Sequence, residues 1–217
     1  MNRTIFLIIL LAFTVVITKA SPVDSISTKY RNEEFATYCQ VWVNSSDSVC
    51  DAVMRDYDYQ MRFKLDALYT WALRGMNLRK EKNELMMLYF KSTSFNKGNS
   101  VLRGIGDVII PGVITIPNIF VDCKLIGEQS GKGNTLKLNL LNSNGFIKNM
   151  NNSLAVIPSK NKGNWLVLES HVKFGWFFNI FITQNRFKLI MEWRLKRFIH
   201  NLKDEAERRE KSAISSK

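Results

Sequence analysis

At Gly175 the spacing of apolar residues changes from that of a β-strand to that of an α-helix, and no other feature of the sequence constrains the fold as strongly. Over residues 164–174, apolar side chains alternate along a strand; from residue 184 to about 209, they recur every three or four positions. The helical stripe consists of Phe187, Ile190, Met191, Leu195, Phe198, Ile199, Leu202 and Ala206, and most charges lie opposite it. A helix of about 26 residues would be about 39 Å long, enough to cross a whole sheet.

The chain ahead of this helix begins with a strand and a short helix. Residues 35–43 are rich in aromatic and β-favouring side chains, which predicts a strand. The polar Asn44-Ser45-Ser46-Asp47 that follows predicts a turn and a cap for a helix over residues 47–56. A second short helix or a turn near residues 59–65 is also expected.

The rest of the chain before Gly175 favours antiparallel strands. The predicted strands are residues 68–78 and 84–95 as a hairpin, two stretches within 101–126, residues 136–140, and a last hairpin of 154–157 with 164–174. Pro111 and Pro117 lack an amide donor and so belong at a strand end, edge or bulge. The Asn-rich residues 143–152 predict a loop, although Phe146 and Ile147 could extend a strand.

Strands that each present an apolar face must be covered, and the long amphipathic helix is the element left to cover them. The element order therefore predicts an α+β fold. Its core would be a curved antiparallel sheet of about six or seven strands gripping one long C-terminal helix, with one or two short helices after the first strand.

This order resembles the helix-grip fold of the START-like superfamily, also called the polyketide cyclase and lipid-transport or Bet v 1-like superfamily. The resemblance covers about residues 35–210 and rests on the element order and on the ending "WLVLESHVKFGWFFNIFITQNRFKLIMEWRLKRFIHNLKDEAERRE". It implies a cavity between sheet and helix for an apolar ligand such as a lipid, sterol or polyketide. Some members are enzymes, whereas others carry or sense ligands; no catalytic motif is matched, so no functional residue carries over.

The N-terminus is typical of a secretion signal. Arg3 precedes an almost wholly apolar run over residues 5–18, and Thr18-Lys19-Ala20 offers small residues for cleavage after Ala20. The apolar run is shorter than the roughly 20 residues that cross a bilayer, although a retained N-terminal anchor is the alternative. We expect residues 1–20 to be a signal peptide, 21–34 a flexible lead, 35–210 a single domain and 211–217 a frayed tail, in a secreted or periplasmic protein.

The sequence is strongly basic. It has 31 Lys and Arg against 19 Asp and Glu, a net charge of +12; residues 1–20 hold Arg3 and Lys19 and no acid, so cleavage leaves +10. Such a charge attracts anionic partners over long distances.

Conventional catalytic and metal motifs are sparse. Glu169 and His171 point to the same strand face and have acid–base chemistry, but a solvated or cross-strand role is favoured. The sequence has three cysteines, Cys39, Cys50 and Cys123, and an odd number cannot pair completely within one chain. We expect free buried thiols at least as readily as a disulfide. We therefore predict no catalytic residue, no metal site and no cofactor.

Dense aromatics around Gly175 are the best binding candidates. They suit either a core or a pocket wall, and if exposed beside the basic helix they would suit a membrane surface. The predicted ligand-binding residues are Phe174, Trp176, Phe177, Phe181, Phe187 and Met191.

Two functions follow from these features. The first is an exported, non-enzymatic binding protein for an apolar small molecule or lipid held between the sheet and the C-terminal helix. The alternative is a basic surface-interaction protein that contacts anionic membrane, envelope polysaccharide or nucleic acid, the last being the least expected. An enzyme is the third class.

Overall fold

The computed structural model describes residues 24–76, 87–110, 112–130, 133–160 and 163–215. Its strands are β1 (Ser25–Arg31), β2 (Glu34–Val43), β3 (Met87–Asn96), β4 (Val101–Ile110), β5 (Ile114–Ser130), β6 (Gly133–Ser143), β7 (Ile147–Ser159) and β8 (Gly163–Phe174). Its helices are α2 (Asp47–Phe63), α3 (Leu65–Leu68), α4 (Trp176–Asn179) and α5 (Gln184–Ser215).

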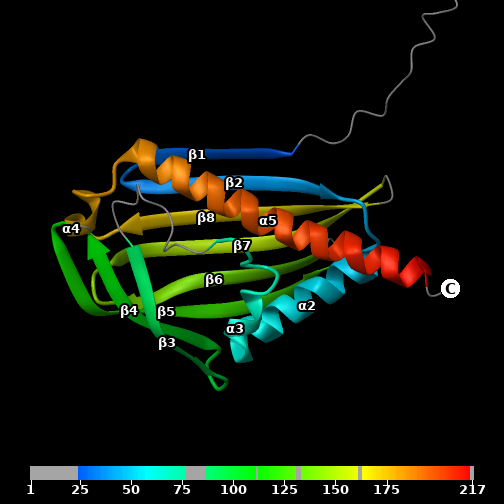
Figure 1. Cartoon of the computed structure of the whole chain (residues 1–217), viewed down its shortest axis with the longest axis horizontal. Coiled ribbons are helices and arrows are strands. Elements are labelled where there is room, and N and C mark those ends of the chain that lie inside the picture. Colours follow the sequence, from blue (N-terminus) through cyan, green and yellow to red (C-terminus); the bar gives the residue numbers. More distant parts are fainter. Residues whose placement is uncertain (1–23, 77–86, 111, 131–132, 161–162, 216–217) are drawn as a thin grey trace, which may run out of the picture.

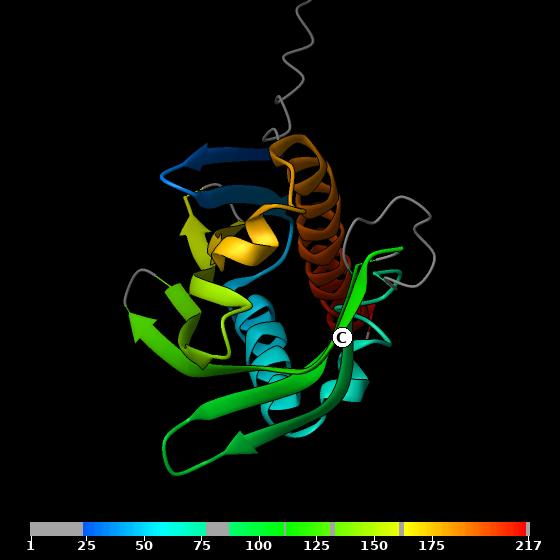
Figure 2. The same cartoon turned by 90° about the vertical axis from the view of Figure 1, so that its left-hand side faces the viewer.

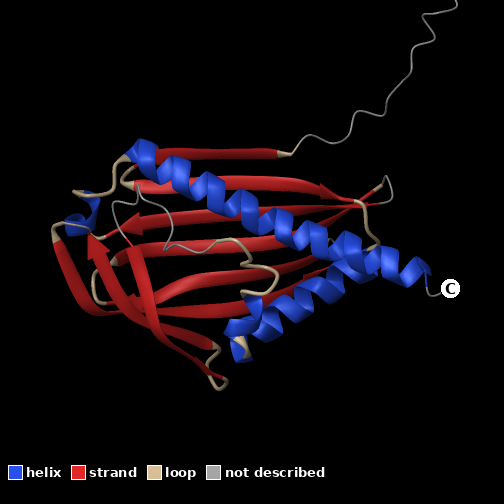
Figure 3. Cartoon of the chain, in the orientation of Figure 1, coloured by secondary structure: helices blue, strands red, loops and turns tan. Residues whose placement is uncertain are grey.

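These strands form one antiparallel sheet in the order β1-β2-β8-β7-β6-β5-β4-β3. Helices α2 and α5 lie on the same face of the sheet, which curves around them (Figures 1 and 2). Figure 3 shows that α5 crosses the strands diagonally from the β1 edge. This is the predicted α+β helix-grip architecture, with eight strands where six or seven were expected.

Gly175 marks the end of β8 for a steric reason. A Cβ built on Gly175 would lie 1.9 Å from the Gly145 carbonyl oxygen, and the Gly175 amide donates to the Phe146 carbonyl at 3.1 Å. No other residue fits this close approach without a shift. The chain then turns through α4 into α5, as the change of period predicted.

The expected flexible lead over residues 21–34 is wrong for residues 25–31, which form β1. This strand pairs with β2 from Ser25 opposite Gln40 to Arg31 opposite Glu34. Ile26, Thr28 and Tyr30 face inward while the residues between them are exposed. A single edge strand with so few apolar residues carries a weak hydrophobic signal, which explains why pairing with β2 was not predicted.

The hairpin expected from residues 68–78 and 84–95 is also wrong in its first half. Residues 69–75 form turns after α3, and β3 pairs with β4 instead; residues 77–86 lie outside the described part. The reason is tertiary: Asn201 on α5 donates to the carbonyls of Ala72 and Arg74, both at 3.0 Å. Leu68 and Ala72 are buried in the core.

Other boundaries shift outward. The helix expected over residues 47–56 runs to Phe63 as α2, and β7 begins at Ile147, within the expected loop. The expected proline irregularity is present, because Pro117 of β5 lies opposite a register shift between Gly106 and Val108 of β4. Pro111 lies outside the described residues.

The frayed tail expected from residue 211 is instead helical to Ser215, which makes α5 32 residues long. The carboxylate of Glu210 accepts hydrogen bonds from the Ser46 amide at 2.9 Å and the Ser45 hydroxyl at 3.0 Å. Arg209 pairs with Asp56 of α2 at 2.5 Å. These contacts with α2 and the residues just before it stabilise the last turns of α5. The pattern of apolar residues along α5 alone does not reveal such contacts.

Cys39, Cys50 and Cys123 are buried, unpaired thiols. Burial is the main cause that raises the pKa of Cys39 and Cys50 to about 11 and that of Cys123 to about 12, so all three stay protonated at neutral pH. Within the described ranges, no helix is both long and apolar enough to span a bilayer. No cluster of three metal-ligating side chains occurs there either.

Candidate ligand pocket

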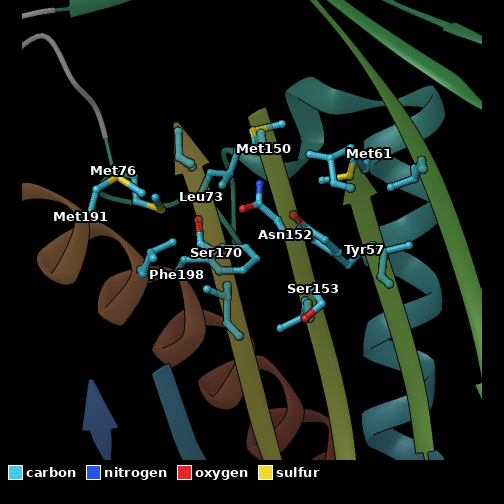
Figure 4. A pocket seen from close by; sticks show the side chains of 17 residues that line it. Tyr57, Met61, Leu73, Met76, Met150, Asn152, Ser153, Ser170, Met191 and Phe198 are labelled. Atoms are coloured by element: carbon cyan, nitrogen blue, oxygen red, sulfur yellow. The ribbon is translucent and has the colours of Figure 1, made fainter. Parts of the chain in front are cut away.

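A pocket of about 290 Å³ lies between the concave face of the sheet and helices α2 and α5. Its floor comes from β5, β6, β7 and β8, and its other walls come from α2, the turns after α3, and α5 (Figure 4). The apolar lining residues are Met61, Leu73, Met76, Leu125, Leu136, Leu138, Met150, Leu154, Leu168, Val172, Met191, Leu195 and Phe198. The lining is therefore mostly aliphatic and thioether in character.

Four methionines contribute to this lining, and they come from separate parts of the fold. Met61 lies on α2, Met76 follows α3, Met150 lies on β7, and Met191 lies on α5. Methionine is unbranched and polarisable, so it adapts to apolar ligands of different shape. A lining with four methionines therefore suits apolar ligands of more than one shape.

A row of polar residues crosses the concave face at one level. Thr28, Thr37, Ser170 and Asn152 lie directly opposite one another on β1, β2, β8 and β7. The two threonine hydroxyls contact each other at 3.0 Å. Ser170 and Asn152 instead line the pocket, where they lie side by side (Figure 4).

The Asn152 amide has an unsatisfied oxygen. Its Oδ1 is buried, and among the residues that the structure describes none lies within hydrogen-bonding distance of it. Buried polar atoms in folded proteins nearly always have a partner, and each exception calls for an explanation such as a missing water or ligand. Because Asn152 lines the pocket, a water or ligand bound in the pocket could be this partner.

Tyr57 faces this amide from the helical side. Its side chain extends from α2 toward β7 (Figure 4), and its ring packs against Phe198 with centroids 5.4 Å apart. Burial is the main cause that raises the pKa of the Tyr57 hydroxyl, with Asp58 adding to it. The phenol therefore stays protonated and keeps a proton to donate.

The structure separates the six predicted binding residues. Met191 alone of the six lines the pocket. Phe174 is buried in a second hydrophobic cluster, and Phe177, Phe181 and Phe187 pack against it. Trp176 is 79% exposed. Ligand contact by these five aromatics stays a prediction.

This second cluster fills the end of the fold nearest α4. Phe35 and Phe187 stack with centroids 3.9 Å apart, and Phe146 meets Phe178 edge-on at 4.9 Å. Close ring packing of this kind is typical of a protein core.

Sequence reasoning missed the polar pocket residues Tyr57, Asn152 and Ser170. A usable signal was present, because Ser170 interrupts the apolar face formed by Leu166, Leu168, Val172 and Phe174. Asn152 similarly interrupts the inward row of β7 between Met150 and Leu154. Isolated polar residues on buried strand faces are costly unless they have a partner.

Glu169 and His171 lie on the opposite face of β8 from Ser170. Glu169 is exposed, and the His171 Nδ1 lies 2.9 Å from the Glu34 carboxylate on β2. The histidine thus has a cross-strand role, in agreement with the sequence prediction.

Solved structures similar to this one include a START superfamily protein from Mycobacterium smegmatis, at 13% identity and a TM-score of 0.47, covering 80% of this chain and 97% of that one. An aromatase/cyclase from a Streptomyces species has 11% identity and a TM-score of 0.47, with coverage of 81% and 95%. A truncated norcoclaurine synthase from Thalictrum flavum has 12% identity and a TM-score of 0.45, with coverage of 83% and 96%. Likenesses this distant say nothing about a ligand or reaction of this chain.

A scan against protein-family models and a search of curated proteins give no match. The fold and the pocket by themselves define a class: a helix-grip protein with a small apolar site that contains a few polar groups.

Proposed function

We propose that this chain is an exported binding protein for a small apolar or lipid-like molecule held between the sheet and α5. The observation that carries the proposal is the pocket of about 290 Å³ with its mainly aliphatic lining. Apolar clefts with a few placed polar groups are the usual form of small-molecule sites. The volume lies just below the roughly 300–1,000 Å³ common for such sites, which favours a compact ligand.

The export part of the proposal is supported by the N-terminal residues. Their positive charge, their apolar run and the small residues at positions 18 and 20 are typical of a signal peptide. Cleavage after Ala20 would leave β1, which begins at Ser25, intact. We therefore propose secretion or periplasmic delivery.

The test uses the full chain expressed with its own leader in an exporting host. We expect the exported protein to begin at Ser21, to release an apolar molecule into organic solvent, and, once extracted, to bind the fluorophore N-phenyl-1-naphthylamine at one saturable site. Recovery of the protein only inside the cell would contradict export.

A pocket-filling variant checks where the dye binds. Leu138 lines the pocket, and Leu138→Trp should weaken dye binding about tenfold, because overfilling a packed site costs about 1–3 kcal/mol. Leu141 lies on the same strand but is 55% exposed, so Leu141→Trp is the matched control and should bind as wild type. Equal affinities in the two variants, or no dye binding by extracted wild type, would contradict the pocket proposal.

A second candidate function, contact with an anionic membrane, is favoured by the surface around the start of α5. Trp176, Ile180, Leu189 and Trp193 are 48–79% exposed. Arg186, Lys188, Lys196 and Arg197 are exposed on the same helix as Leu189 and Trp193. Exposed aromatic and aliphatic side chains beside cations are typical of an interfacial membrane contact.

A further inference from the structure

The unsatisfied amide of Asn152 restricts what the pocket can bind well. Its Oδ1 is buried and, within the described part of the chain, has no hydrogen-bond partner. A wholly apolar ligand would leave this oxygen unpaired, and an unpaired buried acceptor carries a free-energy cost. A ligand that donates a hydrogen bond there would remove the cost.

The polar row across the sheet contains one pair of side chains that contact each other and two members that face the pocket. The Thr28 and Thr37 hydroxyls share one hydrogen bond at 3.0 Å, whereas their neighbours in register, Ser170 and Asn152, line the pocket. The polar row therefore continues from the core into the pocket. Ser170 and Asn152, the two members of this row at the pocket, would be next to a bound ligand (Figure 4).

The opposite wall supplies a donor. Tyr57 comes from α2, lines the same pocket, and keeps its proton because burial raises the pKa of its hydroxyl. One wall thus offers an acceptor and the other a donor. A hydroxyl group can satisfy both at once, since it donates one hydrogen bond and accepts others. An ether or ketone oxygen accepts only, and it would leave Asn152 Oδ1 unpaired.

We propose that the natural ligand is a neutral apolar molecule with a hydroxyl group that donates to Asn152 Oδ1 and accepts from Tyr57, beside Ser170. The apolar part would lie along the leucine and methionine walls. This assignment rests on the proposed binding function and adds the chemical class of the ligand.

The isomers decan-1-ol and 1-methoxynonane provide a matched test. They contain the same numbers of carbon and oxygen atoms, but only the alcohol has a hydroxyl group that can donate a hydrogen bond. Each would displace N-phenyl-1-naphthylamine from the extracted protein. We expect wild type to prefer the alcohol about fivefold or more, the factor for one neutral hydrogen bond. Asn152→Leu should remove this preference and leave ether binding unchanged or stronger.

Asn151 provides the matched control, because it is adjacent on β7 but exposed; Asn151→Leu should keep the wild-type preference. Ser170→Ala and Tyr57→Phe, checked for folding by circular dichroism, should each reduce the preference partially. Equal affinity of wild type for the two isomers, or a preference that survives in Asn152→Leu, would overturn the assignment while leaving apolar binding intact. Failure of both isomers and the dye to bind wild type would overturn the binding function and the assignment together.

Discussion

At the scale of single residues, Asn152 and Asn164 place the same side chain in two settings with different consequences. Each has an Oδ1 that is buried and unpaired among the described residues. The Asn164 Nδ2, however, donates to the Ser45 carbonyl at 2.9 Å and so joins β8 to the chain just before α2. Asn152 instead lines the pocket. The Asn164 amide therefore makes a structural hydrogen bond, whereas the Asn152 amide lines the candidate ligand pocket.

We therefore expect opposite effects on the stability of the ligand-free protein. Asn164→Leu should lower the free energy of unfolding by about 1–3 kcal/mol, because it removes a buried hydrogen bond and leaves a carbonyl with one partner fewer. Asn152→Leu should leave the free energy of unfolding unchanged or raise it by about 1 kcal/mol, because it removes an unpaired polar atom. Urea unfolding of both variants measures this, and destabilisation of similar size in both would contradict the distinction.

At the scale of elements, the end of α5 stabilises the start of α2. Ser46 precedes α2 and its own side chain does not cap the helix. The Glu210 carboxylate of α5 instead holds this N-cap residue, accepting from the Ser46 amide at 2.9 Å and from its hydroxyl at 2.7 Å. A carboxylate at a helix N-terminus also interacts favourably with the helix dipole. Two elements distant in sequence are thereby joined at the end of the sheet opposite α4.

Glu210→Gln should lower the free energy of unfolding by about 1 kcal/mol, the usual value of a cap, because the amide is a weaker acceptor without the charge. Thermal unfolding followed by circular dichroism provides the measurement. Asp204→Asn is the matched control, since Asp204 is exposed on the same helix; a loss equal to that of Glu210→Gln would show that helix charge alone is responsible.

At the scale of the whole molecule, charge and exposed apolar side chains combine near the start of α5. The chain has a net charge of +12, and cleavage of the leader, which removes Arg3 and Lys19, would leave +10. Long-range attraction brings such a protein to an anionic surface, and exposed apolar groups then strengthen the contact. Trp176 and Trp193, which are 79% and 48% exposed, are the aromatic groups placed to do so.

The protein beginning at Ser21 should sediment with vesicles of phosphatidylcholine and phosphatidylserine at low salt and separate from them at about 0.5 M salt, because surface charges are screened. Replacing both Trp176 and Trp193 by Ser should weaken the binding about tenfold through lost apolar burial. Ile157 is 43% exposed on β7, toward the other end of the sheet, so Ile157→Ser should bind as wild type. Binding that is insensitive to salt, or equal in all three proteins, would argue against this function.

The strongest periodic patterns in the sequence correctly predicted the main elements. The alternation before Gly175 and the helical stripe after it predicted β8 and α5, and the run of strands predicted an antiparallel sheet covered by that helix. These predictions succeed because burial of an apolar face imposes a period of two on a strand and 3.6 on a helix. Local spacing alone is enough to reveal them.

Other features depend on contacts between distant segments, and only the tertiary structure decided them. β1 is a strand because β2 offers it a partner, residues 69–75 turn because Asn201 binds their carbonyls, and α5 continues to Ser215 because Glu210 meets α2. The pocket also depends on contacts between segments that are distant in the sequence. The sequence drew attention to the aromatics near Gly175, but Tyr57, Asn152 and Ser170 come from three separate elements. Their hydrogen-bonding chemistry forms a site only because the folded sheet brings Asn152 and Ser170 into register and places α2 across from them.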